Sequence, residues 1–146
     1  MNEGNITEYS IQLKIIKKIF DNEDVINSSS DVVRIMNRFY DFDDREKLYV
    51  MLMDSRKKVI GINLVSVGTI DKVIMNPREV FKPAILLGAS SIIMIHNHPS
   101  LNVTPSMEDR IATDRIIKCG NILDIPLMDH IIYSENNYYS IYDEMD

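Results

Sequence analysis

The chain has 146 residues, 45% hydrophobic and 26% charged, which is typical of one globular domain and unlike a disordered or collagen-like chain. No apolar run approaches the roughly 18–20 residues that span a bilayer, the N-terminus lacks a signal peptide, and the single Cys119 cannot form an internal disulfide, so we expect a cytoplasmic protein with no membrane segment. The formal net charge of −6 is evidence against nucleic-acid binding as the main activity, although small cationic clusters at 14–18 and 56–58 leave it open.

The first 27 residues are expected to form a strand and loop segment that packs on the core of a domain spanning residues 28–146. Tyr9–Ile15 alternates apolar and polar residues, which is typical of a half-buried strand. A polar stretch then leads to a helix predicted over Asp31–Tyr40. Ser29 or Ser30 is its expected N-cap, and its apolar residues recur on one face.

The middle of the chain predicts a buried hairpin and then helical segments. Leu48–Met53 is continuously apolar, as in a strand buried on both faces, and Val59–Val67 is its expected hairpin partner. Asp71–Met75 is a candidate short strand. Asn76 precedes a proline and lies three residues before a glutamate, which predicts a helix start. Pro83 is expected to break or kink this helix before a second helical piece.

The last third of the chain predicts further strands around one long helix. Ser91–Ile95 reads as a short buried strand, and a cap at Thr104 followed by proline predicts a helix that ends near Gly120. Leu127–Tyr133 and Tyr138–Tyr142 are expected strands. Strands interleaved with helices predict an α/β fold in which a mixed sheet lies between helices packed on its faces.

Two of the three histidines follow a buried strand and bring candidate metal ligands together. His96 and His98 lie two residues apart, so in extended backbone their imidazoles point to the same side, while Asn97 points away. Ser106 lies in the first turn of the next helix. Asp109 follows it by three residues, which places both on one helix face.

This residue set is typical of a catalytic zinc site. Two imidazoles and one carboxylate hold zinc and leave a fourth position for water, and zinc lowers the pKa of that water toward about 7. Such a site also needs a general base that is not a ligand and a donor to the developing oxyanion. Ser106 is placed to donate, and a carboxylate from elsewhere in the chain must supply the base.

The string H-x-H-x7-S-x2-D at His96–Asp109 resembles the JAMM motif of the JAB/MPN metalloproteases. Further stretches resemble the RadC-like branch of this family, namely Val67–Ile70, Asn76–Ser90, Ile92–Ser100, Thr104–Asp109 and Ile125–Tyr133. The resemblance covers roughly Ser28–Tyr142 and is most specific from Asn76 onward.

The resemblance implies a three-layer α/β/α fold of the cytidine-deaminase-like kind with a mixed sheet. It implies zinc held by His96, His98 and Asp109, with Ser106 as the oxyanion donor. The catalytic glutamate of the family precedes the first central strand, and Glu46 matches that position. Glu46 is therefore the acid/base candidate that the resemblance implies.

Two departures and one further histidine accompany the resemblance. Leu101 stands where the family pattern HNHPSG has glycine, so a positive φ there would strain the loop beside the metal. The helical region that precedes the catalytic domain in full-length RadC-like proteins has no counterpart in the short N-terminal segment. For His130 we favour a buried, hydrogen-bonded structural role over one that orients the site.

The main functional hypothesis is a zinc-dependent hydrolase that cleaves an amide or isopeptide bond, with a protein or peptide as substrate. The resemblance also offers a role as a DNA-repair or mobile-element accessory protein, against which the acidic charge argues. A non-catalytic interaction domain is the third hypothesis, which the complete set of ligand positions disfavours. The sequence names neither the substrate nor the oligomeric state.

Overall fold

The computed structural model describes residues 8, 10, 14, 24–38 and 44–142. The elements in this part of the chain are α1 (Ser29–Met36), β1 (Lys47–Met53), β2 (Val59–Val67), α2 (Pro77–Leu87), β3 (Ser91–Asn97), α3 (Met107–Leu123), β4 (Leu127–Tyr133) and β5 (Tyr138–Ser140). The strand expected at Tyr9–Ile15 lies, apart from two residues, outside the described residues.

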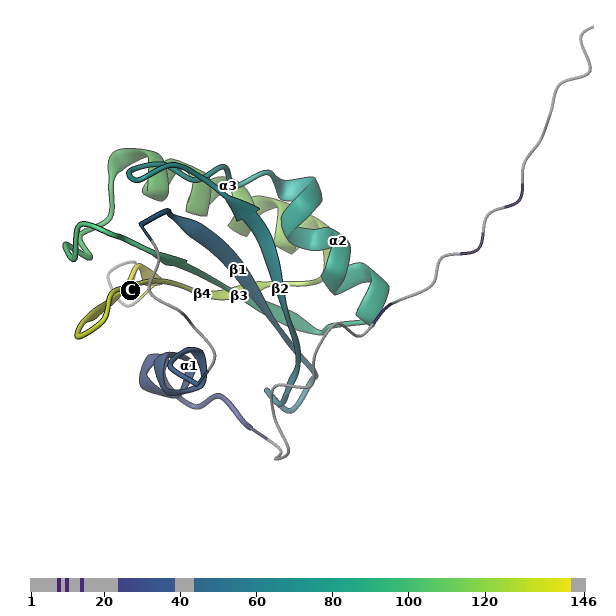
Figure 1. Ribbon diagram of the computed structural model, residues 1–146. Helices are drawn as coiled ribbons and strands as arrows, with labels where there is room; N and C mark the ends of the chain where they lie inside the picture. Colours follow the sequence, from purple (N-terminus) through teal and green to yellow (C-terminus); the bar gives the residue numbers. More distant parts are fainter. Residues whose placement is uncertain (1–7, 9, 11–13, 15–23, 39–43, 143–146) are drawn as a thin grey trace, which may run out of the picture.

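The strands form one mixed sheet in the order β2-β1-β3-β4-β5 (Figure 1). β1 runs antiparallel to both β2 and β3, β3 and β4 are parallel, and β5 returns antiparallel to β4. α1 covers one face of the sheet, and α2 and α3 cover the other (Figure 1). The three-layer α/β/α fold with a mixed sheet is thereby confirmed. No helix in the described ranges has the length and apolar content that crossing a bilayer requires.

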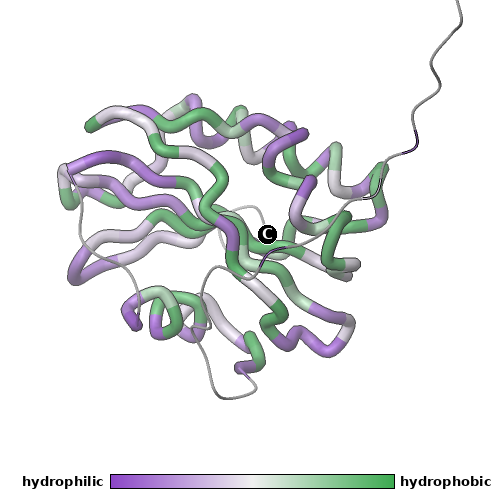
Figure 2. The backbone as a smooth tube through the Cα atoms, turned by 45° about the vertical axis from the view of Figure 1, so that its right-hand side comes forward, coloured by the Kyte–Doolittle hydropathy of each residue, from purple (hydrophilic) through white to green (hydrophobic). Residues whose placement is uncertain are grey.

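Hydrophobic residues dominate the central strands β1 and β3 (Figure 2). Successive side chains of these strands point to opposite faces of the sheet, so they fill one core on each face. The core under α2 and α3 contains the first set, which is Leu48, Val50, Leu52, Ile92 and Met94. The core under α1 contains the second set, which is Met51, Met53, Ile93 and Ile95. Because Ile92 and Met94 face α3, the next residue of the same alternation, His96, faces α3 as well.

The C-terminal end of α3 lies very close to the segment that leads into β4. A Cβ atom on Gly120 would stand 2.6 Å from the carbonyl oxygen of Ile125, so no larger residue fits there without a shift of the backbone. The backbone N–H of Ile125 also donates to the carbonyl of Gly120 at 3.0 Å. Gly120 therefore sets how closely α3 packs on the sheet.

Several predicted elements differ in the structure. α2 continues through Pro83 to the left-handed Gly88, because the core holds Val80, Phe81 and Ala84 on both sides of the proline. Asp71–Met75 is not a strand. It follows a turn in which the N–H of Thr69 donates to the carbonyl of Lys72 at 2.8 Å.

The boundaries of the outer elements also shift. α1 takes Ser28 as its N-cap in place of Ser29 or Ser30, since Ser28 and Asp31 form a reciprocal capping box. α3 extends past Gly120 to Leu123, and β5 ends at Ser140.

Candidate metal centre

Two histidines meet at the C-terminal end of β3, in the middle of the sheet. His96 is fully buried near the end of the strand, and His98 begins the loop that leads to α3. Their Nε2 atoms are 3.0 Å apart. Both rings therefore point to one place, as their two-residue spacing predicts.

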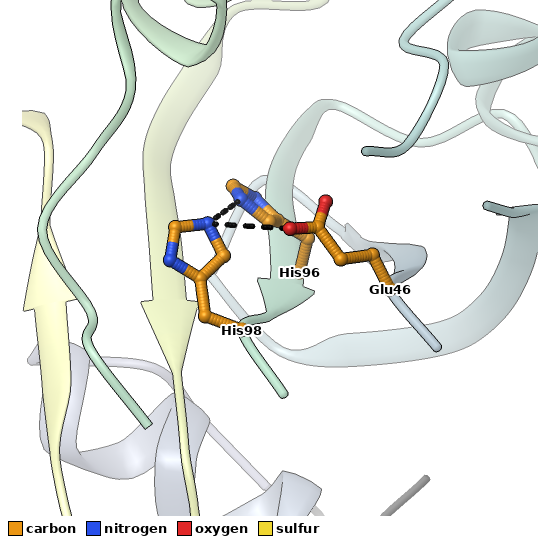
Figure 3. A group of neighbouring side chains, drawn as sticks. All are labelled: Glu46, His96 and His98. Carbon is orange, nitrogen blue, oxygen red and sulfur yellow. Dashed lines mark hydrogen bonds and ion pairs between the residues drawn. The ribbon is translucent and has the colours of Figure 1, made fainter. Parts of the chain in front are cut away.

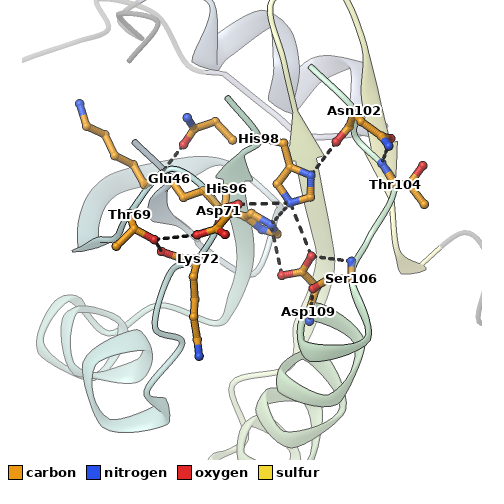
Figure 4. A network of polar contacts seen from close by, with 12 residues as sticks. Glu46, Thr69, Asp71, Lys72, His96, His98, Asn102, Thr104, Ser106 and Asp109 are labelled. Atoms are coloured by element: carbon orange, nitrogen blue, oxygen red, sulfur yellow. Dashed lines mark hydrogen bonds and ion pairs between the residues drawn. The ribbon is translucent and has the colours of Figure 1, made fainter. Parts of the chain in front are cut away.

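Asp109 reaches the same place from the first turn of α3. Ser106 is the N-cap of this helix, and its Oγ accepts the N–H of Asp109 at 3.1 Å. In return, the N–H of Ser106 donates to Asp109 Oδ2 at 2.8 Å. This capping box corrects the expected cap at Thr104, and it fixes the carboxylate of Asp109 toward the histidines (Figure 4).

The spacing of these three side chains fits a tetrahedral metal ion. Asp109 Oδ1 lies 3.4 Å from His96 Nε2, and Asp109 Oδ2 lies 3.5 Å from His98 Nε2. Ligand atoms about 2.0–2.1 Å from a tetrahedral zinc ion are separated by about 3.3–3.4 Å. The observed distances of 3.0, 3.4 and 3.5 Å, in which each ring faces a different oxygen of Asp109, are close to that separation.

The donors and acceptors of the site favour a cation. His98 Nδ1 lies 2.7 Å from the carbonyl oxygen of Asn102, which can only accept a hydrogen bond. The Nδ1 atom of His98 therefore carries a proton, and the Nε2 lone pair of the neutral ring points at His96 and Asp109. Lone pairs and carboxylate oxygens that converge without a donor bind a metal ion or a proton.

The pKa values of the same groups follow from their contacts. Burial lowers the pKa of His96 and keeps its ring neutral. Burial opposes ionisation of Asp109 too, but the contacts with the His96 and His98 rings outweigh it and hold the pKa of that carboxyl well below its usual range. Burial would lower the pKa of His98, yet its hydrogen bonds with Asp109 and Asn102 raise it overall. His98 is thus the ring that takes up a proton when no metal is bound.

Glu46 faces the histidines from the residue before β1 (Figure 3). Its Oε1 is 3.8 Å from His98 Nε2, and ligand atoms of Glu46, His96 and His98 lie within 4.8 Å of one another. Asp109 lies 3.4 Å from His96 and 3.5 Å from His98, so four side chains that can bind a metal converge on one place. Burial raises the pKa of Glu46 to about 7, so near neutral pH this carboxyl can both accept and give up a proton.

Asn97 holds the backbone around Glu46, a role that sequence reasoning missed. Its Oδ1 accepts the N–H of Lys47 at 2.7 Å, and its Nδ2 donates to the carbonyl of Arg45 at 2.9 Å. Asn97 does point away from the two rings, as expected, and it does so in order to reach β1. The antiparallel pairing of β1 with β3 brings the two segments together.

His130 lies directly behind His96, in the neighbouring strand β4. Its Nε2 is 2.7 Å from His96 Nδ1, and its Nδ1 is 2.6 Å from the hydroxyl of Thr113 on α3. The ring is buried and hydrogen-bonded, as we favoured, but its partner is a candidate metal ligand. A role of His130 in orienting the site, the less favoured alternative, stays a prediction.

The site opens into a cleft of about 550 Å³. Its lining includes Glu46, His98, Ser106 and Asp109 together with the segment 70–73. Because Ser106 Oγ accepts the N–H of Asp109, its own hydrogen remains available to a molecule in the cleft. All five residues singled out in the sequence thus lie at or beside this cleft (Figure 4).

The loop after His98 contains a backbone conformation that is unusual for its side chain. Leu101 has a φ of 67°, in the left-handed region that favours glycine. Its N–H closes a turn onto the carbonyl of His98 at 3.1 Å. The strain expected from the replacement of glycine is therefore present beside the metal site.

The model of the RadC-like JAB domain family matches residues 26–145 of the chain. A UPF0758 protein from Thermotoga maritima is 45% identical over 101 residues, which are 69% of this chain and 46% of the relative. A second UPF0758 protein, from Rubrobacter xylanophilus, is 42% identical over 117 residues, which are 80% of this chain and 51% of the relative. The chain spans about half the length of these relatives.

Proposed function

This chain belongs to the family of RadC-like JAB domains, and we propose that it is a zinc-dependent hydrolase of amide bonds. One observation carries the proposal. The Nε2 atoms of His96 and His98 and the carboxylate of Asp109 are separated by 3.0–3.5 Å, as three ligands of one tetrahedral ion would be. The donor set of two imidazoles and one carboxylate is that of catalytic zinc sites, which leave a position open.

Glu46 acts as general base and then as general acid. When bound, zinc would supply the Lewis acidity that polarises a carbonyl and activates water near neutral pH. The Glu46 carboxylate takes one proton from the attacking water and passes it to the amine that leaves. A pKa of about 7 suits both steps, because such a group is neither fully ionised nor fully protonated at neutral pH.

Ser106 stabilises the charge that develops on the carbonyl oxygen of the substrate. The capping box fixes the position of its hydroxyl and leaves its hydrogen free to donate into the cleft. A donor fixed before the reaction needs no reorganisation when the charge forms, which is where such groups lower the barrier.

The substrate class is an amide, peptide or isopeptide bond in a protein or peptide. A cleft of about 550 Å³ is within the usual range of binding pockets. Family membership and zinc chemistry support this class, and neither selects a particular protein substrate.

The experiment begins with the metal content of protein purified without chelator or affinity metal. About one zinc per chain, lost in Asp109→Ala, is the expected result. Peptide and isopeptide substrates are then screened, and Glu46→Gln is compared with the wild type. We expect Glu46→Gln to keep its zinc and to lose about 10²–10⁴-fold in kcat.

A matched control is Glu135→Gln, which removes an exposed carboxylate in the turn between β4 and β5, outside the residues that line the cleft. It should retain its activity. No zinc uptake by the wild type would overturn the proposal, and full activity of Glu46→Gln would overturn the role of that glutamate.

A further inference from the structure

We propose that Thr113 and His130 are positioning residues that fix His96 in the tautomer whose Nε2 lone pair faces the metal. The inference rests on the metal site of the proposed function and concerns two residues outside the ligand set. Both are buried, and neither was singled out as a site residue in the sequence. They link α3 to β4 and β4 to β3 behind the histidine rings.

The chain of hydrogen bonds begins at a group that can only accept. The hydroxyl of Thr113 is 2.6 Å from the backbone carbonyl oxygen of Asp109, one turn earlier in α3. A carbonyl has no proton to offer, so Thr113 must donate its single hydroxyl hydrogen there. Toward any other partner Thr113 can then only accept.

That partner is His130, whose Nδ1 lies 2.6 Å from the same hydroxyl. Since Thr113 accepts this bond, His130 carries its proton on Nδ1. The ring of His130 is fully buried and neither of its two hydrogen-bond partners is a carboxylate, so the ring is neutral and Nε2 carries only a lone pair. His130 Nε2 accepts the bond of 2.7 Å from His96 Nδ1.

His96 therefore carries its proton on Nδ1, away from the site, and its Nε2 is bare. The opposite tautomer would place an N–H among the ligand atoms and prevent metal coordination through that nitrogen. His98 reaches the same state through one contact, with the carbonyl of Asn102. Because His96 is fully buried and faces α3, it obtains the same result through two further side chains.

The hydrogen bonds connect two candidate ligands from different elements, Asp109 on α3 and His96 on β3. Asp109 offers its carboxylate to the metal, and its backbone carbonyl is the acceptor that ultimately sets the tautomer of His96. An irregularity in the pairing of β4 with β3 brings His130 opposite Met94, on the face that carries His96. Helix position and strand register are thus both needed for the chain of bonds.

The test compares Thr113→Val, which keeps the shape and removes the hydroxyl, with Thr113→Ser, which keeps it. Without an acceptor for Nδ1–H, His130 should move its proton to Nε2, and His96 should then carry its proton on Nε2. We expect Thr113→Val to bind zinc about 10–100-fold more weakly in competition with a chromophoric chelator, and Thr113→Ser to restore the affinity. Ser140→Ala is the matched control. It removes a buried hydroxyl that donates to Asp129 rather than to Thr113 or His130.

A second measurement separates this inference from the proposed function. ¹⁵N chemical shifts of the imidazoles in the metal-free protein report the tautomer directly, and we expect the Nδ1–H form of His96 in the wild type and in Thr113→Ser. The Nε2–H form in the wild type, or unchanged zinc affinity in a folded Thr113→Val, would overturn the inference. If the wild type shows the Nδ1–H form but takes up no zinc, the proposed function fails while the tautomer assignment stands.

Discussion

The carboxamide of Asn97 is hydrogen-bonded to the backbone on both sides of Glu46. The carboxamide oxygen accepts from the N–H of Lys47 and the carboxamide nitrogen donates to the carbonyl of Arg45, so Asn97 fixes the backbone that carries the proposed general base. Such positioning matters because a displacement of a catalytic group by about 1 Å can cost about 10²-fold in rate.

Asn97→Asp tests this role of Asn97. The new oxygen would face the carbonyl of Arg45 and repel it, so the backbone at Glu46 should shift. We expect kcat to fall by about tenfold or more while the zinc affinity stays near that of the wild type. Steady-state kinetics and metal competition measure the two effects separately, and an unchanged kcat would show that Glu46 is held by other contacts.

Asp109 has two tasks that different substitutions can separate. Asp109→Asn keeps an oxygen that accepts the N–H of Ser106, whereas Asp109→Ala removes it. Both variants should lose zinc. In urea unfolding of the metal-free proteins, the alanine variant should be less stable than the asparagine variant by about 0.5–2 kcal/mol, the usual contribution of such caps. Equal stability of the two variants would mean that the capping box does not stabilise α3.

Leu101→Gly should stabilise the protein. Glycine adopts a φ of 67° without steric cost, and this gain exceeds the entropy that glycine adds to the unfolded chain. We expect the free energy of unfolding to rise by about 0.5–1 kcal/mol, with zinc affinity retained. Leu101→Ala is the control, because it keeps a Cβ and so should bring no gain. If Leu101→Gly is no more stable than Leu101→Ala, the result argues against strain at this position.

Glu46 makes the stability of the metal-free protein depend on pH. Folding raises the pKa of this carboxyl from its ordinary 4.5 to about 7, so the folded state holds the proton more tightly than the unfolded chain. Its contribution is greatest below pH 4.5 and is lost as the pH rises to about 7, by on the order of 3 kcal/mol. Glu46→Gln should lack this loss.

The measurement is urea unfolding of both metal-free proteins between pH 5 and pH 8. The advantage of Glu46→Gln over the wild type should grow with pH across this window. Groups remote from Glu46 contribute equally to both proteins and cancel in the difference, whereas the pKa of His98, which the Glu46 charge raises, is lower in the variant and acts in the same direction. A difference that stays constant with pH would mean that folding leaves the proton affinity of Glu46 unchanged.

Local patterns in the sequence sufficed to predict the central strands and the convergence of the candidate ligands. The apolar run Leu48–Met53 had to be buried on both faces, and the spacing of His96 and His98 had to bring their rings together. At Ser106 the sequence contained the capping-box pattern, but the threonine and proline just before it matched a helix start equally well. Local chemistry alone could not choose between them.

Contacts between distant elements were beyond those patterns. His130 is 34 residues from His96, and it reaches that ring only because β3 and β4 are parallel and their register shifts near Ile92. The sequence around Thr113 is that of an ordinary helix and gives no signal of the positioning role proposed for this residue. Asn97 could be assigned a direction from its position in the strand, but its partners on β1 depend on the antiparallel pairing.

The close approach of Gly120 to Ile125 couples the packing of one end of α3 to the position of its other end. The helix is fastened at the Gly120 end against the sheet, and it presents Asp109 at the other end, eleven residues or about 16 Å away. A methyl group added at Gly120 would push this end outward, and a stiff rod transmits such a tilt along its whole length. A substitution at Gly120, about three helical turns from Asp109, can therefore displace a candidate ligand that it does not touch.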